Sequence, residues 1–202
     1  MKTSEISELI KMGNEKETIR INPGEYGFTM DPDKVLYTTN LDYCVGLGLV
    51  EDVRKNRKRG LAHIFGGGDK KSKDSKGRLV ASKESIQRVD SVLTSFVGDF
   101  KGKMFQNIKD FRRMYSLIVF SRPFYGNTES YENPMATHIM NWLLGHDINL
   151  KKIEDINDWD AQAISHKDMA LHHNKLAVLY RNSRGKLLNY GNTDEELENF
   201  EL

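Results

Sequence analysis

Three polar residues in the first third of the chain, Thr38, Cys44 and His63, have the types and the order that thiol catalysis requires. Cys44 is the only cysteine, and a free thiol with a pKa near ~8.5 is only a few per cent ionised at neutral pH. An adjacent imidazole can take the thiol proton and stabilise a thiolate–imidazolium pair. The Thr38 hydroxyl can accept from the other ring nitrogen and so fix the tautomer and orientation of His63.

The strands predicted around Cys44 and His63 bring these two residues together. Cys44 opens a buried strand over residues 44–50, in which two glycines permit close backbone approach. A charged loop over 51–59 follows, and residues 60–65 return as a second strand that carries His63. Antiparallel pairing places such residues within side-chain reach, and backbone N–H groups at the turn before Cys44 can hold the oxyanion of a tetrahedral intermediate.

The pattern alone also permits a purely structural interpretation of both residues. A lone cysteine in an apolar strand is more often a small buried hydrophobe than a nucleophile. A histidine between Ala62 and Ile64 is likewise more often a core residue with satisfied hydrogen bonds. On residue types and spacing alone, the structural interpretation is favoured.

The remaining elements follow from hydrophobic periodicity and turn signals. They are, in chain order, a helix over 4–12, a strand near 19–21, a β-prone run over 35–37 that leads to Thr38, a helix over 83–100 capped by Ser82, a strand over 115–120, a helix over 134–144 with Pro134 in its first turn, a strand over 148–156, and a hairpin of 176–180 with 186–190. This order predicts an α/β fold, a layered α/β/α sandwich around a mixed, largely antiparallel sheet. We expect an N-terminal extension over 1–18, one domain over 19–192 and an acidic, frayed tail over 193–202.

Four motifs carry a resemblance to a known family. They are Pro23-Gly24-Glu25-Tyr26, Val35-Leu36-Tyr37-Thr38, Cys44-Val45-Gly46 and Gly60-Leu61-Ala62-His63-Ile64. Together they resemble the CheD-like protein-glutamine deamidases, which include chemoreceptor deamidases and toxins of the Burkholderia lethal factor type. The resemblance implies this family's layered fold, a catalytic trio of Cys44, His63 and Thr38, and conversion of a glutamine side chain to glutamate in another protein.

The chain departs from the family's pattern where a substrate would be held. The small Gly-Ser pair before the family's cysteine is replaced by Asp42 and Tyr43, and two later glycine motifs are replaced by segments that contain Tyr125 and Trp159. Gly66 begins a three-glycine run beside His63 that can serve as a lid. The candidate substrate-binding residues are therefore Asp42, Tyr43, Gly66, Tyr125 and Trp159, and we expect the substrate to differ from the family's usual one.

Composition excludes several classes of function. The net charge of +1 gives no general drive toward nucleic acid or anionic membrane. No apolar run approaches the ~20 residues of a membrane span, and Met1–Arg20 lacks the apolar region of a Sec-type signal. A lone thiol suits a reducing compartment. We therefore expect a cytoplasmic monomer, or an effector exported without a cleaved Sec-type signal.

Two further clusters have simpler explanations than a binding site. His166, His172 and His173 match no standard ligand spacing, so they favour a solvated loop, and we expect neither a metal nor a cofactor. The basic stretches 54–59 and Lys70-Lys71 are solvated loops by default. Because both flank the predicted site, docking of an acidic partner protein is the better functional alternative for them.

Three functions remain open on this basis. The first is a thiol-dependent deamidase whose target is either a chemoreceptor or a host protein. The second is a protein-binding module that keeps the CheD-like fold without turnover, given Asp42 and Tyr43. The third is transamidation, in which an amine replaces water at the same acyl-enzyme.

Overall fold

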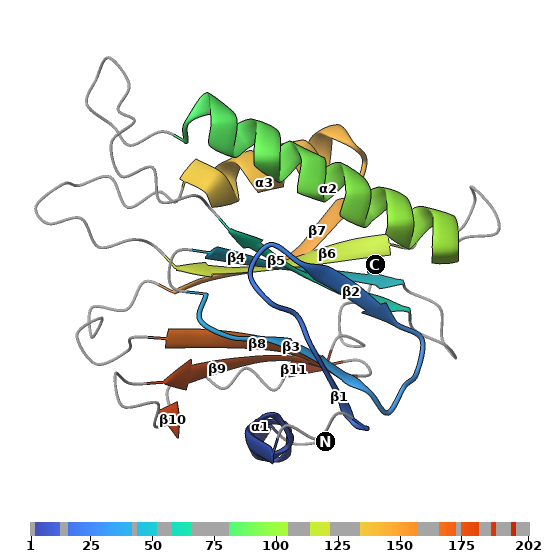
Figure 1. Ribbon diagram of the computed structural model, residues 1–202, viewed down its shortest axis with the longest axis vertical. Helices are drawn as coiled ribbons and strands as arrows, with labels where there is room; N and C mark the ends of the chain where they lie inside the picture. The colour runs from blue at the N-terminus through green and yellow to red at the C-terminus, as the bar shows by residue number, and fades with distance from the viewer. Residues whose placement is uncertain are drawn as a thin grey trace, which may run out of the picture.

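A computed structural model describes residues 3–12, 16–41, 44–51, 58–65, 81–104, 114–121, 134–156, 166–172, 175–181, 187–188 and 195–196. Two β-sheets face each other, and helices cover the outer face of each (Figure 1). Sheet A comprises β1 (Thr18–Arg20), β3 (Val35–Thr38), β8 (His166–His172), β9 (Lys175–Arg181), β10 (Leu187–Leu188) and β11 (Glu195–Glu196). Sheet B comprises β2 (Tyr26–Thr29), β5 (Arg59–Phe65), β4 (Cys44–Glu51), β6 (Met114–Ser121) and β7 (Asn149–Ile156), in that spatial order.

Three apolar cores separate the four layers. Helices α2 (Lys83–Met104) and α3 (Pro134–Gly145) pack on sheet B through a core that includes Leu47, Phe96 and Ile139. A second core between the sheets, here called the inter-sheet core, joins side chains of both. The third core lies between sheet A and helix α1 (Thr3–Met12), which contributes Ile6 and Ile10. The order of layers is helix, sheet, sheet, helix.

The predicted α/β class is confirmed, but its single central sheet is divided into two. Both sheets are mixed: β1 and β3 pair parallel, as do β6 and β7, while the other recorded pairs are antiparallel. The chain passes from sheet A to sheet B between β3 and β4. Buried residues on both faces of β4 allow this strand to contact the helices on one side and the other sheet on the other.

The sequence did not predict strands β2 and β8. The solvated loop expected at His166, His172 and His173 is wrong for the first two, and His173 lies outside the described residues. His166 and His172 are the ends of β8, which pairs with β3 on one side and β9 on the other. The middle of β8 is apolar, and its Met169 and Leu171 lie in the inter-sheet core. Charged residues near the start of β8 hide this short apolar run from a periodicity argument.

The two glycines in β4 permit the close approach that the sequence predicted, and in the structure side chains of the second sheet are among the groups that approach them. A Cβ on Gly46 would lie 2.7 Å from Met169 Sδ and 2.9 Å from Leu41 Cδ1. A Cβ on Gly48 would lie 3.0 Å from Leu171 Cδ1. Any side chain at Gly46 would therefore displace the residues that pack beside the Thr38–Cys44 segment.

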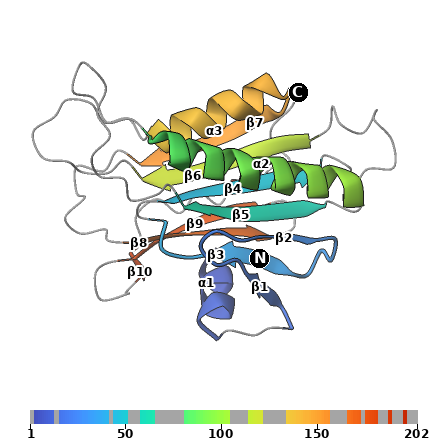
Figure 2. The same ribbon diagram turned by 45° about the horizontal axis from the view of Figure 1, so that its top comes forward.

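Helices α2 and α3 lie side by side on the outer face of sheet B (Figure 2). The predicted cap is present, because Ser82 Oγ accepts a hydrogen bond from Ser85 N at 3.1 Å. The helix continues beyond the predicted end at residue 100 to Met104. Among the helices in the described ranges, none combines the length and the apolar character that a membrane span requires.

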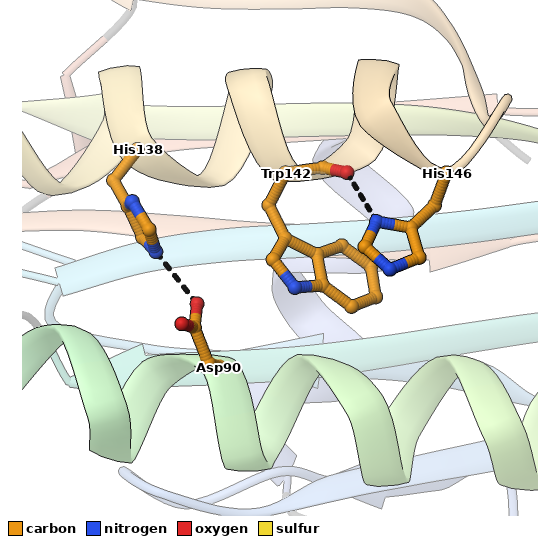
Figure 3. A network of polar contacts seen from close by, with 4 residues as sticks. All are labelled: Asp90, His138, Trp142 and His146. Carbon is orange, nitrogen blue, oxygen red and sulfur yellow. Dashed lines mark hydrogen bonds and ion pairs between the residues drawn. The ribbon is translucent and has the colours of Figure 1, made fainter.

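Two polar contacts lie on this outer face, and one of them joins α3 to α2 (Figure 3). His138 Nε2 of α3 contacts Asp90 Oδ1 of α2 at 2.6 Å. His146 Nδ1 donates to the Trp142 carbonyl at 2.7 Å, and the two rings stack with centroids 3.8 Å apart. The sequence predicted that Trp142 is a core residue, and in the structure it is half-buried against the core between sheet B and the two helices. Both contacts lie on the opposite face of sheet B from the inter-sheet core.

Both predicted flanking segments, the N-terminal extension and the acidic tail, contain elements that contact sheet A. Helix α1, within the predicted extension, packs on sheet A through Ile6 and Ile10. The predicted hairpin forms, with Leu187 opposite Arg181. In the acidic tail, where fraying was expected, Glu195 and Glu196 pair with β9 as the short strand β11. The limits of the domain stay predictions.

Candidate active site

Thr38 and His63 meet in the apolar layer between the two sheets. Thr38 ends β3 in sheet A, on the same face as Leu36 of the inter-sheet core. His63 lies in β5 of sheet B, on the same face as Leu61 of that core. Thr38 Oγ1 and His63 Nδ1 are 2.6 Å apart, and both residues are fully buried. Each sheet thus contributes one partner to a polar contact inside an apolar layer.

The hydrogen bonds of Thr38 define the tautomer of His63. The hydroxyl of Thr38 has one proton, which it donates to the Ile21 carbonyl at 2.8 Å. Toward His63 the same oxygen can only accept, so Nδ1 carries the ring proton and Nε2 carries the lone pair of the neutral ring. Within the described part of the chain, Nε2 has no hydrogen-bond partner. His63 is therefore arranged to accept a proton at Nε2.

The environment of His63 keeps the ring neutral. Burial lowers its pKa from 6.5 to about 4, because the surrounding apolar side chains solvate the imidazolium poorly. At neutral pH the ring is a base with its lone pair free. The thiolate–imidazolium pair that the sequence allows is consequently disfavoured at rest, because its imidazolium would be poorly solvated in this layer.

Cys44 begins β4, beside the strand that carries His63. These strands pair antiparallel, with Gly46 opposite His63 and Cys44 opposite Phe65. Since side chains alternate between faces, Cys44 and His63 share the inter-sheet face as diagonal neighbours, whose Cα atoms are typically about 7–8 Å apart. Cys44 is 5% exposed and belongs to the inter-sheet core. No hydrogen bond joins its Sγ to His63 Nε2, so the thiol is near the base without being bonded to it.

The segment that connects Thr38 to Cys44 is anchored at two points. Asn40 has a left-handed backbone conformation, with φ of 62°, and its N–H donates to Asp168 Oδ1 at 3.2 Å. Leu41 is fully buried in the inter-sheet core. A non-glycine residue in this conformation costs free energy and persists where neighbouring contacts hold it. These contacts hold Asn40 and Leu41 in place between Thr38 and Cys44 in the sequence.

A turn over residues 21–25 supports both Thr38 and His63. Its first carbonyl accepts the Thr38 proton, Gly24 N donates to the His63 carbonyl at 2.8 Å, and His63 N donates to the Glu25 carbonyl at 3.0 Å. Asn22 Nδ2 donates to Glu25 Oε2 at 2.9 Å and closes the turn. This turn contains Gly24 and Glu25 of the Pro23–Tyr26 segment, and its contacts give these residues a physical role in positioning the base.

The five predicted substrate-binding residues are not placed by the structure. Asp42, Tyr43, Gly66, Tyr125 and Trp159 lie outside the described residues, and so does the turn whose N–H groups were expected to hold an oxyanion. These assignments stay predictions.

One residue of the predicted basic loops is buried in the fold. Arg59 is the first residue of β5, is 1% exposed and donates through Nη2 to the Asp31 carbonyl. Burial lowers its pKa to about 10, while the charges of Asp31 and Asp33 act in the opposite direction. The expectation of a solvated or docking residue is therefore wrong for Arg59. Residues 54–57 and Lys70-Lys71 lie outside the described ranges.

Sequence reasoning missed several residues that shape the site. Ile21 contributes only its main-chain carbonyl, which accepts the Thr38 proton, so its side-chain type does not indicate this role. Asp168 acts from a strand distant in the sequence. Phe65 was included only as the end of a strand, although the register places it opposite Cys44. The described ranges hold no group of three or more His, Cys, Asp or Glu residues that could bind a metal ion.

Comparisons with known proteins give little further information. No protein-family model matches the chain, and no curated protein matches it in sequence. Among solved structures it is similar to the C-terminal domain of CNFy from Yersinia pseudotuberculosis, with 9% identity and a TM-score of 0.37. The match covers 89% of this chain and 62% of the other, so the chain spans less than two thirds of that domain. A likeness of this size assigns neither a fold family nor an activity.

Proposed function

We propose that this chain is a thiol-dependent protein-glutamine deamidase of the CheD-like class, with Cys44 as nucleophile, His63 as base and Thr38 as the residue that orients His63. One observation carries the proposal: the 2.6 Å contact between Thr38 Oγ1 and His63 Nδ1, which fixes the proton on Nδ1 and leaves Nε2 as the acceptor on the face it shares with Cys44. The sequence motifs support the same trio independently.

The proposed reaction begins with a neutral Cys44 thiol and a neutral His63 ring. His63 Nε2 takes the proton of the Cys44 thiol while Sγ adds to the carboxamide carbon of a glutamine side chain. The tetrahedral intermediate collapses, the C–N bond breaks, and the leaving nitrogen receives the proton from Nε2 to form ammonia. Water then adds to the thioester with His63 as base, the C–S bond breaks, and Sγ recovers a proton. The target protein gains one glutamate, and transamidation follows if an amine replaces water.

The second candidate, a protein-binding module without turnover, is favoured by one observation. Cys44 is 5% exposed and His63 is fully buried, so a substrate carboxamide must displace neighbouring groups before it reaches Sγ. Thiol reactivity separates the two candidates, because an enzyme must expose a reactive sulfur and a binding module need not.

Conversion of glutamine to glutamate in a target protein tests the proposal. The full chain and its Cys44→Ala variant are incubated with the cytoplasmic domain of a chemoreceptor and, separately, with a host-cell lysate. Mass spectrometry of tryptic peptides then locates each converted residue. The proposal expects conversion at specific glutamines by the wild type alone. Conversion by Cys44→Ala at the same sites and rate would contradict it, as would an unchanged peptide map in both samples.

A further inference from the structure

Phe65 is the residue that faces Cys44 across the strand pair. It ends β5, its Cα is paired with that of Cys44, and it shares the inter-sheet face with His63 because the two are separated by one residue. Directly opposite residues of an antiparallel pair have Cβ atoms about 5 Å apart. The Cβ atom that carries the aromatic ring of Phe65 therefore lies beside the Cβ atom that carries the thiol.

The exposure of Phe65 contrasts with the burial of its neighbours. Phe65 is 46% exposed, whereas Cys44 is 5% and His63 is 0% exposed. Met30 and Leu144 are the other large exposed hydrophobic residues of the described ranges, and neither is paired in register with a residue of the trio. Cys44 opens its strand and Phe65 closes the neighbouring one, so at this end of the sheet a half-exposed aromatic residue is paired in register with the cysteine.

We propose that Phe65 is a specificity-determining residue that binds an apolar side chain next to the target glutamine. This inference rests on the proposed function, because it assumes that a substrate reaches Cys44. A phenyl ring has no polar group to offer, so covering its exposed surface is favourable for an apolar neighbour. A carboxylate neighbour would lose hydration there without gaining a partner. The preferred substrates therefore carry an aliphatic or aromatic residue beside the glutamine.

Two chloroacetamides test this preference without a known substrate. N-methyl- and N-benzyl-chloroacetamide carry the same reacting group: Sγ displaces chloride, a C–S bond forms as the C–Cl bond breaks, and the thiol proton passes to His63 Nε2. The ratio of the benzyl rate to the methyl rate, divided by the same ratio for glutathione, measures the apolar contact. We expect this normalised ratio to be roughly tenfold in the wild type and close to one in Phe65→Ala.

A matched variant and a conservative variant complete the test. Met30→Ala removes an exposed apolar side chain elsewhere and should keep the wild-type ratio, while Phe65→Leu should keep most of it. The same ratio in wild type and Phe65→Ala, with a reactive thiol in both, would overturn the role of Phe65 and leave the proposed function standing. A higher ratio in Phe65→Ala would also overturn it, because the ring would then be an obstacle. A wild-type thiol that neither probe alkylates would overturn both proposals.

Discussion

The buried neutral ring of His63 should make the stability of the protein depend on pH in a defined window. The pKa of His63 is 6.5 in the unfolded chain and about 4 in the folded protein. Because the folded value is the lower one, the unfolded state binds the proton first as the pH falls. The contribution of His63 to the free energy of unfolding is therefore fully present above pH 6.5, and it is lost progressively as the pH falls from 6.5 to about 4.

The size of the loss follows from these two values. Between about pH 7.5 and about pH 5, the linkage relation gives a decrease of about 2 kcal/mol in the free energy of unfolding from His63 alone. Other groups titrate in the same range, so the contribution of His63 is the difference between the wild type and a variant that cannot titrate. His63→Asn serves this purpose, because an amide N–H can still donate to Thr38 Oγ1.

Urea unfolding at both pH values provides the measurement. We expect the wild type to lose about 2 kcal/mol more than His63→Asn on going from about pH 7.5 to about pH 5. The denaturant dependence of the unfolding free energy should be the same for both proteins, which shows that the same surface unfolds. Parallel losses in the two proteins would refute the claim that His63 is buried as a neutral base.

Three further substitutions test the support of the site. Thr38→Val removes the acceptor of the Nδ1 proton. We expect alkylation of Cys44 by chloroacetamide to slow at least tenfold and the free energy of unfolding in urea to fall by about 1–3 kcal/mol. An unchanged alkylation rate would argue against the role of Thr38 in fixing the tautomer of His63. Gly46→Ala places a methyl group 2.7 Å from a side chain of sheet A, so urea unfolding should report a loss of about 1–3 kcal/mol, and unchanged stability would contradict the close sheet packing. Glu25→Ala opens the turn behind His63 and should slow alkylation by a few-fold with a stability change under about 1 kcal/mol; Glu25→Gln should restore the rate, and equal rates in all three proteins would exclude a positioning role.

The sequence predicted most elements of the fold, because their signals are local. Helix α2 has an apolar face and a serine cap, and β4 and β6 are largely apolar. The division into two sheets was not predictable in this way. It depends on which strands pair, and β8, the strand that pairs with β3, starts with charged residues. A pairing between segments more than a hundred residues apart leaves no local pattern.

The site was predictable to the extent that its chemistry resides in side-chain types. The order of Thr38, Cys44 and His63 and the surrounding motifs indicate the trio. The neutral state of His63 could not be predicted, since it depends on burial between two sheets. The tautomer could not be predicted either, because it depends on the main-chain carbonyl of Ile21. Phe65 has its significance only through its register with Cys44.

The pH dependence of Cys44 alkylation tests the central claim, that His63 Nε2 acts as a general base for the thiol, most directly. The rate constant for chloroacetamide is measured from about pH 4 to about pH 9 in the wild type and in His63→Asn, with peptide mapping to confirm that Cys44 is modified. A thiol without a base loses about tenfold in rate for each pH unit below its pKa of ~8.5. We expect His63→Asn to follow that slope throughout, and the wild-type rate to level off at a plateau in the acidic part of the range until His63 is protonated near pH 4. A wild-type profile with the slope of His63→Asn would contradict the account.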